Sequence, residues 1–261
     1  WHFQHFRKLR QKINQMPFKD LFYKEIVMSY VFEPMPVVGI PVQGTEQLYP
    51  VRRIYCVGRN YAAHAREMGF DPDREPPFFF CKPNDAQSVV PVFENQAVDL
   101  PYPSQTSNYH YEIELVVAIG KDGKDISVED AADYIYGYAV GLDMTRRDLQ
   151  MAMREKGRPW EIGKAFDYSA PIGPIHPIST LGELNTGDIH LTVNGKTVQH
   201  SDLTHLIWNV AEVISNLSSL FELKKGDLIM TGTPEGVGAV VKGDQMQAEI
   251  AGLTGITVNV K

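Results

Sequence analysis

Cysteine is scarce in this chain. Among 261 residues only Cys56 and Cys81 occur, and neither belongs to a CxxC pair or to a cluster of cysteine and histidine. A disulfide framework and a structural zinc site are therefore not indicated, and we expect a reducing, cytoplasmic compartment. Long apolar runs are missing too: none approaches the about 20 residues of a membrane helix, and no segment resembles a signal peptide. We therefore expect no membrane partner.

Basic charge is also in short supply. The 25 Lys and Arg residues are outnumbered by 32 Asp and Glu residues, which gives a formal net charge of −7. Such a chain lacks the massed positive surface that neutralises nucleic-acid phosphates, so we expect no nucleic-acid partner. An anionic substrate would need a local basic pocket. The hydrophobic content, by contrast, is 43%, and the length suffices to bury the core of one large domain.

Residues 1–27 differ from the rest of the chain, because they are basic and aromatic and begin with Trp rather than Met. We interpret them as an N-terminal extension. The alternatives are a translated upstream leader, with Met28 as the native start, or an added tag; a transit peptide is disfavoured because the basic and apolar positions form no helical stripe. Residues 28–261 are predicted to form a single domain, with a strand-and-loop segment at 28–51 and the core at 52–261.

Short apolar runs separated by turn residues dominate this domain. Prolines between positions 29 and 50 are too frequent for a helix, and Asn194-Gly195 is a type I′ hairpin signal. The strongest helix signal lies at 203–220, where apolar residues recur with helical spacing. Because turns rather than regular crossover helices join the strands, the pattern predicts a β-rich α+β fold and not a doubly wound sheet.

The segment NYHYEIELVVAIG places Glu112 and Glu114 two positions apart where an apolar run begins. In a strand these side chains share one face, while Ile113 and the apolar residues that alternate after it face the core. Two like charges at this spacing repel, so the pair indicates either a solvated strand face or a bound cation. Asp143 ends a second buried-looking strand, GYAVGLDMT, where it is also a candidate helix N-cap.

Glu112, Glu114 and Asp143 thus share a position at the end of a predicted strand, where a sheet delivers side chains to one rim. Three carboxylates without a neighbouring His or Cys are hard oxygen donors, which favours Mg²⁺, with Mn²⁺ or Ca²⁺ as alternatives, over zinc. The remaining coordination positions are left to water or substrate. A 2-oxo acid suits such an ion, because its keto oxygen and carboxylate form a bidentate pair.

Other polar residues are candidates with a structural alternative. His64 and Glu67 lie three apart on a predicted helix at 60–68, a spacing that alone favours a surface pair over a catalytic dyad. Lys82 ends an aromatic strand, where a cation is well placed for an anion. Lys164 stands in a predicted strand, WEIGKAFD, where a snorkelling edge residue is the alternative. The glycines of GTPEGVG allow backbone N–H groups and Thr233 to approach a small anion.

Six segments together resemble the fumarylacetoacetate hydrolase superfamily, over the chain from about Arg52 to the C-terminus. They are, in order, GRNYAAHAREMG, the FxxKP pattern at 79–83, YEIELVVAIG, YAVGLDMTRRDLQ, KGRPWEIGKAFD and GDLIMTGTPEGVG. No single piece is specific, but the set and its order are. The sequence is similar to the short-chain acylpyruvate hydrolase branch, and PPFFFCKPNDA favours the bacterial fumarylpyruvate hydrolases. The resemblance implies a β-rich mixed roll with flanking helices, assembled as a homodimer.

The resemblance also implies a role for each candidate residue. The implied metal ligands are Glu112, Glu114 and Asp143, the water-activating pair is His64 and Glu67, and the substrate contacts are Arg147, Gln150, Lys164 and Thr233, with Lys164 also catalytic. We add Arg59 and Lys82 as counter-charges for a second substrate carboxylate. The chain departs from the eponymous enzyme at Val57, where that branch has a further aspartate ligand. A more open metal site and a smaller substrate are therefore expected.

The expected reaction is metal-dependent hydrolysis of the carbon–carbon bond of an acylpyruvate. Fumarylpyruvate, which gives fumarate and pyruvate in aromatic-compound catabolism, is the favoured substrate. Decarboxylation or tautomerisation of oxaloacetate and isomerisation of a hydroxymuconate are alternatives on the same metal site. A non-enzymatic binding module would lack part of the dyad or of the ligand set, whereas this sequence has both.

Overall fold

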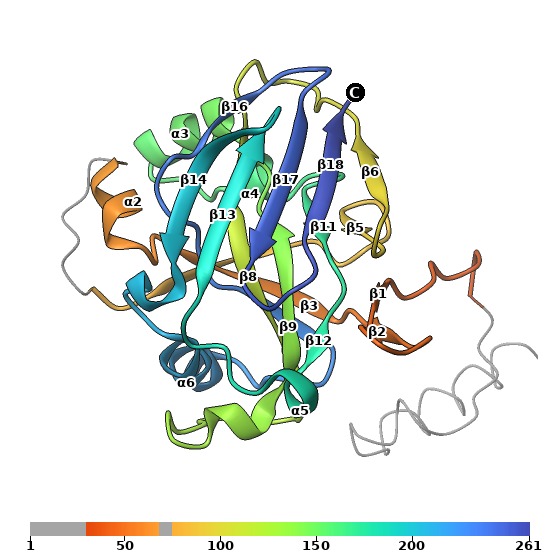
Figure 1. Cartoon of the computed structure of the whole chain (residues 1–261), viewed down its shortest axis with the longest axis vertical. Helices are drawn as coiled ribbons and strands as arrows, with labels where there is room; N and C mark the ends of the chain where they lie inside the picture. Colours follow the sequence, from red (N-terminus) through yellow and green to blue (C-terminus); the bar gives the residue numbers. More distant parts are fainter. Residues whose placement is uncertain (1–29, 68–74) are drawn as a thin grey trace, which may run out of the picture. The chain divides into compact units, whose positions relative to one another are not determined.

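The computed structural model describes residues 30–67 and 75–261, and Pro36–Lys261 form one compact unit. The expected N-terminal extension at 1–27 lies outside the described residues. In the compact unit strands outnumber helices, and most of them are joined by turns and loops (Figure 1). The predicted β-rich α+β class is therefore confirmed.

The described strands form four sheets. The largest is mixed, with the order β4 (Phe78–Lys82), β3 (Arg53–Gly58), β15 (Asp227–Met230), β8 (Ile113–Ile119), β9 (Ile135–Leu142), β11 (Ala170–Ile172) and β5 (Val89–Pro91), and with β12 (His176–Pro177) also paired to β9. The second has the order β14 (Lys196–Asp202), β13 (Asp188–Val193), β17 (Gln245–Ile250), β18 (Ile256–Val260) and β6 (Ala97–Leu100). The small sheets are β10 (Thr145–Arg146), β7 (Tyr109–Tyr111) and β16 (Gly238–Val240), and β1 (Gly39–Pro41) with β2 (Leu48–Pro50).

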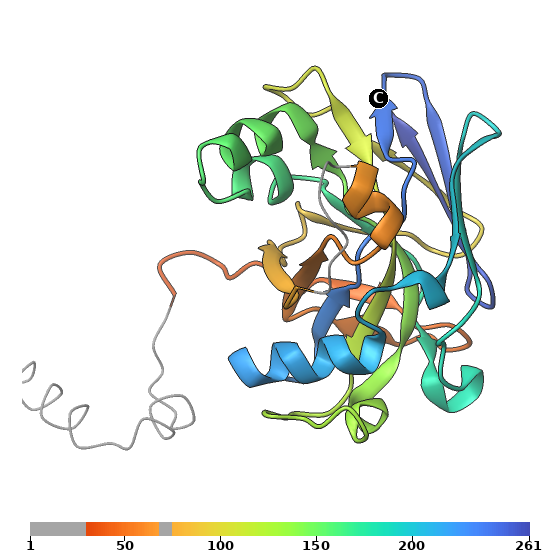
Figure 2. The same ribbon diagram turned by 90° about the vertical axis from the view of Figure 1, so that its left-hand side faces the viewer.

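The described helices are short and lie outside the sheets. They are α2 (Ala62–Glu67), α3 (Arg147–Glu155), α4 (Glu161–Lys164), α5 (Ile178–Leu181) and α6 (Val210–Leu220), with 3₁₀ turns at Ala131–Tyr134 and Leu203–His205. Two views at right angles place α3, drawn in green, and α6, drawn in blue, toward opposite ends of the vertical axis (Figures 1 and 2). The sheets between them therefore form the scaffold of the unit.

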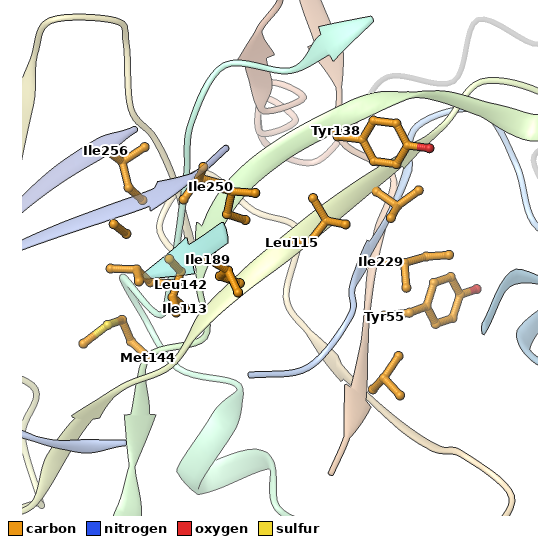
Figure 3. Close-up of a cluster of buried hydrophobic side chains, with 14 of the residues drawn as sticks. Tyr55, Ile113, Leu115, Tyr138, Leu142, Met144, Ile189, Ile229, Ile250 and Ile256 are labelled. Carbon is orange, nitrogen blue, oxygen red and sulfur yellow. The ribbon is translucent and has the colours of Figure 1, made fainter. Parts of the chain in front are cut away.

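Strand β8 runs through the core, and all seven of its residues are buried. Ile113 and Leu115 belong to the larger hydrophobic cluster, which also contains Ile189 from the second sheet (Figure 3). The alternate side chain of Val116 belongs to a second cluster together with Ile40 of β1. The predicted inward face of this strand is confirmed, and its other face is buried as well. A backbone packed on both sides holds the polar residues at its start in fixed positions.

The helix predicted at 203–220 is divided into a 3₁₀ turn and α6. The side chain of Asn209 accepts a hydrogen bond from the backbone N–H of Glu212, and the Glu212 carboxylate accepts one from the N–H of Asn209, each at 3.0 Å. This capping box starts α6 at Val210 and explains why the helix begins later than predicted. The predicted hairpin turn is confirmed, since Asn194 and Gly195 have φ angles of 50° and 77° between β13 and β14.

The segment 160–167, predicted as a strand, forms the short helix α4 instead. The Trp160 carbonyl accepts hydrogen bonds from the N–H groups of Gly163 and Lys164, at 2.8 and 3.0 Å. A Cβ atom on Gly163 would lie 2.8 Å from the Cα of Gln150, so this turn packs closely against α3. The strand prediction was wrong because the local apolar pattern does not report that packing. As a result, Lys164 ends a helical turn and is buried.

Candidate active site

Three buried carboxylates meet where β8 begins and β9 ends. Glu112 precedes β8, Glu114 is the second residue of β8, and Asp143 follows β9. The two strands are antiparallel neighbours, with Ile113 opposite Leu142, so the start of one meets the end of the other. One carboxylate oxygen from each of the three acids lies within 4.8 Å of the others, and all three residues are buried. This burial excludes the reading of a solvated strand face.

Positive side chains neutralise Glu112. Lys164 Nζ lies 2.5 Å from Glu112 Oε2 and 2.6 Å from Asp143 Oδ2, and Arg147 contacts Glu112 Oε1. Burial favours the neutral acid, but Lys164 and Arg147 outweigh it and hold the pKa of Glu112 below its ordinary value. Burial likewise opposes the charge of Lys164, yet Asp143 and Glu112 raise the pKa of this lysine. Arg147 also donates to Oε1 of Gln150 at 2.5 Å, which joins two predicted substrate contacts.

The carboxylates retain capacity for a cation. Glu114 forms no ion pair within the described residues, and its Oε2 accepts a hydrogen bond from Gly232 N–H at 2.8 Å. Burial, followed by the charges of Asp143 and Glu112, raises the pKa of Glu114 well above its ordinary value. Asp143 Oδ1 is buried and accepts no hydrogen bond, although Lys82 Nζ lies 2.7 Å from it. A divalent ion would give Glu114 the positive partner that it lacks within the described residues, and carboxylate oxygens are donors that Mg²⁺ and Mn²⁺ prefer, so the residues fit such an ion.

Lys82 does not occupy the position expected of a substrate contact. Its Nζ lies 2.7 Å from Asp143 Oδ1, in an ion pair that lacks the alignment of a hydrogen bond. It donates to the backbone carbonyls of Met144 and Lys164, at 3.2 and 2.5 Å. The lysine is buried and does not line the cavity formed by the other candidates. It is thus placed to hold Asp143 and the backbone around it, not to meet a second substrate carboxylate.

His64 and Glu67 contact each other on α2, with 3.1 Å between Nδ1 and Oε2. The N–H of Gly236 donates to both Glu67 oxygens at 3.2 Å, and the hydrogen bond from His64 lowers the pKa of Glu67. His64 is 6% exposed and lines the cavity, whereas Glu67 does not. With Nδ1 bonded to a carboxylate, Nε2 is the ring nitrogen that remains to accept a proton.

The glycine-rich turn after β15 binds carboxylates of the protein itself. Gly232 N–H donates to Glu114, and Gly236 N–H donates to Glu67. The expectation that these N–H groups bind a small anion is therefore corrected. The φ angles of the two glycines, 101° and 88°, lie where residues with a Cβ are strained. One short turn thus positions both a carboxylate of the acidic cluster and the partner of His64, while Thr233 between them lines the cavity.

The sequence did not single out Gln199, which is buried in β14 and connects the second sheet to this turn. Its Nε2 donates to the Thr233 hydroxyl at 2.9 Å and to the Pro234 carbonyl at 2.8 Å. Its Oε1 accepts the N–H of Ile113 at 3.0 Å. No local pattern could have revealed this role, since the bonded residues Thr233 and Ile113 are 34 and 86 positions away.

Most candidate residues share one cavity. Of the eleven, nine line it and only Glu67 and Lys82 do not. Val57, the position of the departure from the eponymous enzyme, is also in its wall. Arg154 and Trp160 line the cavity too, although the sequence did not mark them as functional. Trp160 lies within KGRPWEIGKAFD, one of the segments that carry the resemblance, and Arg154 lies just before that segment. The resemblance was the only signal in the sequence for either residue.

This chain belongs to the fumarylacetoacetate hydrolase family, because the family model for the C-terminal part of fumarylacetoacetate (FAA) hydrolase matches residues 53–261. Among solved structures it is similar to fumarylpyruvate hydrolase from Pseudomonas aeruginosa in complex with Mn²⁺ and pyruvate, with 61% sequence identity, a TM-score of 0.87, and coverage of 89% of this chain and 99% of that one.

Curated relatives include enzymes with different reactions. A fumarylpyruvate hydrolase from Ralstonia sp is 47% identical over 190 residues, which cover 73% of this chain and 95% of the relative. A mitochondrial oxaloacetate tautomerase from Arabidopsis thaliana is 39% identical over 210 residues, which cover 80% of this chain and 91% of the relative. The match therefore shows the family, and the relatives within it carry more than one named reaction.

Proposed function

We propose that this protein is a divalent-metal-dependent hydrolase that cleaves fumarylpyruvate to fumarate and pyruvate. The similarity, at 61% identity, to a fumarylpyruvate hydrolase whose structure holds Mn²⁺ and pyruvate carries this proposal. In the reaction, the oxygen of water bonds to the acyl carbonyl carbon, the bond from that carbon to the methylene carbon breaks, and the methylene carbon takes up a proton. The net change is addition of one water across one carbon–carbon bond.

Glu112, Glu114 and Asp143 would hold the ion, and we propose Mg²⁺ as the physiological metal. When bound, such an ion acts as a Lewis acid toward the keto and carboxylate oxygens of the pyruvate half. The chain keeps two of these ligands in place: Gly232 N–H donates to Glu114, and the Lys82 ammonium lies beside Asp143. Carboxylates fixed in this way need little reorganisation when a cation enters.

His64 is the proposed general base. It takes a proton from water as the water oxygen bonds to the acyl carbon, and Glu67 fixes the ring so that Nε2 is the basic nitrogen. The positive charge that forms on the ring is stabilised by the Glu67 carboxylate. That carboxylate is held in turn by the N–H of Gly236.

The cations of the cavity stabilise negative charge that develops during bond cleavage. Lys164 and Arg147 already lie against carboxylates in the cavity, so both stand beside the space where a substrate oxygen would gain charge. Gln150 orients Arg147, and Thr233 offers a hydroxyl to the substrate carboxylate. Arg59 is proposed to bind a second carboxylate at the acyl end.

Within the described residues, no helix combines the length and apolar character that crossing a membrane requires. We propose a cytoplasmic homodimer whose catalytic domain spans residues 28–261. Size-exclusion chromatography with light scattering tests the assembly, and a mass corresponding to one chain would contradict it.

The activity test uses purified protein stripped of metal with a chelator and then supplied with Mg²⁺ or Mn²⁺. Fumarylpyruvate, acetylpyruvate and oxaloacetate are offered separately, and released pyruvate is measured with a coupled dehydrogenase. We expect metal-dependent pyruvate release from fumarylpyruvate, and loss of that release in His64→Ala with Mn²⁺ binding retained. Full activity of His64→Ala would remove the histidine from the mechanism.

Oxaloacetate tautomerisation is the second candidate, favoured by the 39% identical relative that carries this activity in its name. The His64–Glu67 pair can move a proton between carbon and oxygen without water attack, so the same groups serve either reaction. Turnover of oxaloacetate without pyruvate release from either acylpyruvate would overturn the hydrolase proposal in favour of this candidate.

A further inference from the structure

Asn60 is a buried polar side chain that has no role in the proposed chemistry. It is 1% exposed and stands between the end of β3 and the start of α2. Its side-chain amide donates to the carbonyls of Thr231 and Trp208, at 2.8 and 2.9 Å, and its Oδ1 accepts the N–H of Trp208 at 2.8 Å. Both N–H groups and the oxygen of this amide are therefore bonded to the main chain of two other segments.

The main chain beside Asn60 is held by the segment that precedes α6. The Asn60 carbonyl accepts the N–H of Ile207 at 2.8 Å, and Tyr61 forms an antiparallel bridge with Leu206. Together with the bonds to Trp208, these contacts attach the start of α2 to three consecutive residues. A helix of six residues has little stability of its own, so the position of α2 depends on such attachments.

The segments that Asn60 joins lead to different parts of the site. On one side α2 carries His64, the proposed general base. On the other side Thr231 is followed by Gly232, whose N–H donates to Glu114 at 2.8 Å. Asn60 therefore connects the helix of the proposed base to the turn that holds a proposed metal ligand.

The turn after β15 approaches Asn60 closely. A Cβ atom on Gly232 would lie 2.7 Å from the Cβ of Asn60, which is too close for two such atoms. The φ angle of Gly232, 101°, also disfavours a residue with a side chain. Glycine at position 232 thus allows Asn60 to pack directly against the turn.

The turn is held more firmly than the helix. The N–H and the hydroxyl of Thr231 both donate to the Leu115 carbonyl, at 3.0 and 2.9 Å, and these bonds are buried in the largest sheet. The far end of α2 is held by an exposed contact, in which Gly236 N–H lies 3.2 Å from each Glu67 oxygen. Loss of the Asn60 amide should therefore displace α2 more than the turn.

We propose that Asn60 is a positioning residue that sets the place of His64 relative to the acidic cluster. This inference rests on the proposed hydrolase function, and Asn60 acts through α2, since it does not itself line the cavity. A displacement of about 1 Å can lower the rate of a reaction that depends on alignment about a hundredfold. Proton transfer to His64 has this dependence, whereas binding of the metal and of the pyruvate half does not involve α2.

The test compares wild type with Asn60→Ala and Asn60→Asp, with kcat for pyruvate release from fumarylpyruvate expressed per bound Mn²⁺, so that unfolded molecules do not count. Asn60→Asp keeps the shape and the acceptor of the side chain but removes both donors, and it decides the question if Asn60→Ala does not fold. We expect kcat to fall about tenfold or more, while Kd for Mn²⁺ and for pyruvate changes less than about twofold.

Val258→Ala, a truncation in the core at β18, is the control for lost stability and should keep kcat per bound Mn²⁺. An unchanged kcat in the Asn60 variants would overturn the positioning role. A loss of pyruvate affinity as large as the loss of kcat would overturn it as well, because it would indicate a general distortion of the site.

A measurement without turnover separates this proposal from the hydrolase function. Bound Mn²⁺ broadens the NMR signals of nearby nuclei, and the broadening decreases steeply with distance. In protein with labelled histidine, we expect the broadening of the His64 ring signals to differ between wild type and the Asn60 variants, while that of His110 on β7 stays the same. Equal broadening of His64 would overturn the proposal. If wild-type protein released pyruvate from neither acylpyruvate, the hydrolase function would fail, and this comparison would still decide whether Asn60 positions His64.

Discussion

The side-chain amide of Gln199 donates a 2.9 Å hydrogen bond to the hydroxyl of Thr233. Gln199 belongs to β14 of the second sheet, and Thr233 lines the cavity in the turn that follows β15 of the largest sheet. This contact therefore connects the two sheets at the proposed substrate site. The other end of the amide accepts the N–H of Ile113, next to Glu112 and Glu114. One buried side chain therefore fixes both a substrate contact and the strand that carries two proposed metal ligands.

Gln199→Leu should lower stability and activity together. The substitution leaves the Ile113 N–H and the Pro234 carbonyl buried without their partner, which costs about 1 to 3 kcal/mol in the free energy of unfolding. It also frees Thr233, so we expect a higher KM for an acylpyruvate. Urea unfolding and steady-state kinetics measure the two effects. Gln247→Leu makes the same chemical change on the exposed side of β17 and should alter neither; an unchanged KM in Gln199→Leu would contradict the positioning role.

Glu114→Gln should separate metal affinity from stability. In the metal-free protein, burial beside two further acids raises the pKa of Glu114, so its ionised form is costly at neutral pH. A neutral side chain of the same shape removes that cost, and we expect metal-free Glu114→Gln to be at least as stable as wild type.

The same variant should lose the stabilisation that Mn²⁺ gives wild type, because one ligand charge is missing. Thermal unfolding with and without Mn²⁺ measures both quantities. Glu249→Gln, at an exposed position of β17, serves as the control and keeps the response to Mn²⁺. A normal Mn²⁺-dependent rise in Tm for Glu114→Gln would remove this residue from the proposed ligands.

The acidic cluster was predictable from sequence because two simple rules brought its members together. Alternation along a strand put Glu112 and Glu114 on one side, and Asp143 ended another strand. In the structure, the antiparallel pairing of β8 with β9 brings the two strand ends together. The sequence alone could not specify that pairing. The sequence could reveal the type of donor. The approach of the carboxylate oxygens to within 4.8 Å of one another depends on the register of β8 against β9.

The remaining features depend on contacts between distant segments. Lys82 ends a strand as predicted, but its side chain turns to Asp143, 61 residues further on, and no local pattern gives that direction. Lys164 was predicted in a strand and lies in a helical turn, because Gly163 packs against Gln150. Long-range packing overrides the local signal in both cases.

His110 should make stability depend on pH. Burial and the charge of Arg147 lower the pKa of His110 from 6.5 to about 4. The unfolded chain therefore binds a proton at a pH where the folded protein does not, and stability is lost as pH falls from about 6.5 toward about 4. We expect His110→Gln to lose less stability than wild type over this range, as measured by urea unfolding. His205→Gln, at an exposed position, is the control; parallel curves for wild type and His110→Gln would contradict the assignment.

Lys82→Met should distinguish a support for Asp143 from a contact to substrate. Removal of the ammonium group leaves the buried Asp143 Oδ1 without its cation, which costs about 3 kcal/mol of stability in the metal-free protein. Because the lysine lies outside the cavity, kcat/KM for fumarylpyruvate and for acetylpyruvate should fall by the same factor. Lys261→Met, which removes an exposed lysine paired with Asp99, is the matched control. A loss confined to fumarylpyruvate would instead place Lys82 at the second carboxylate and restore the role expected from sequence.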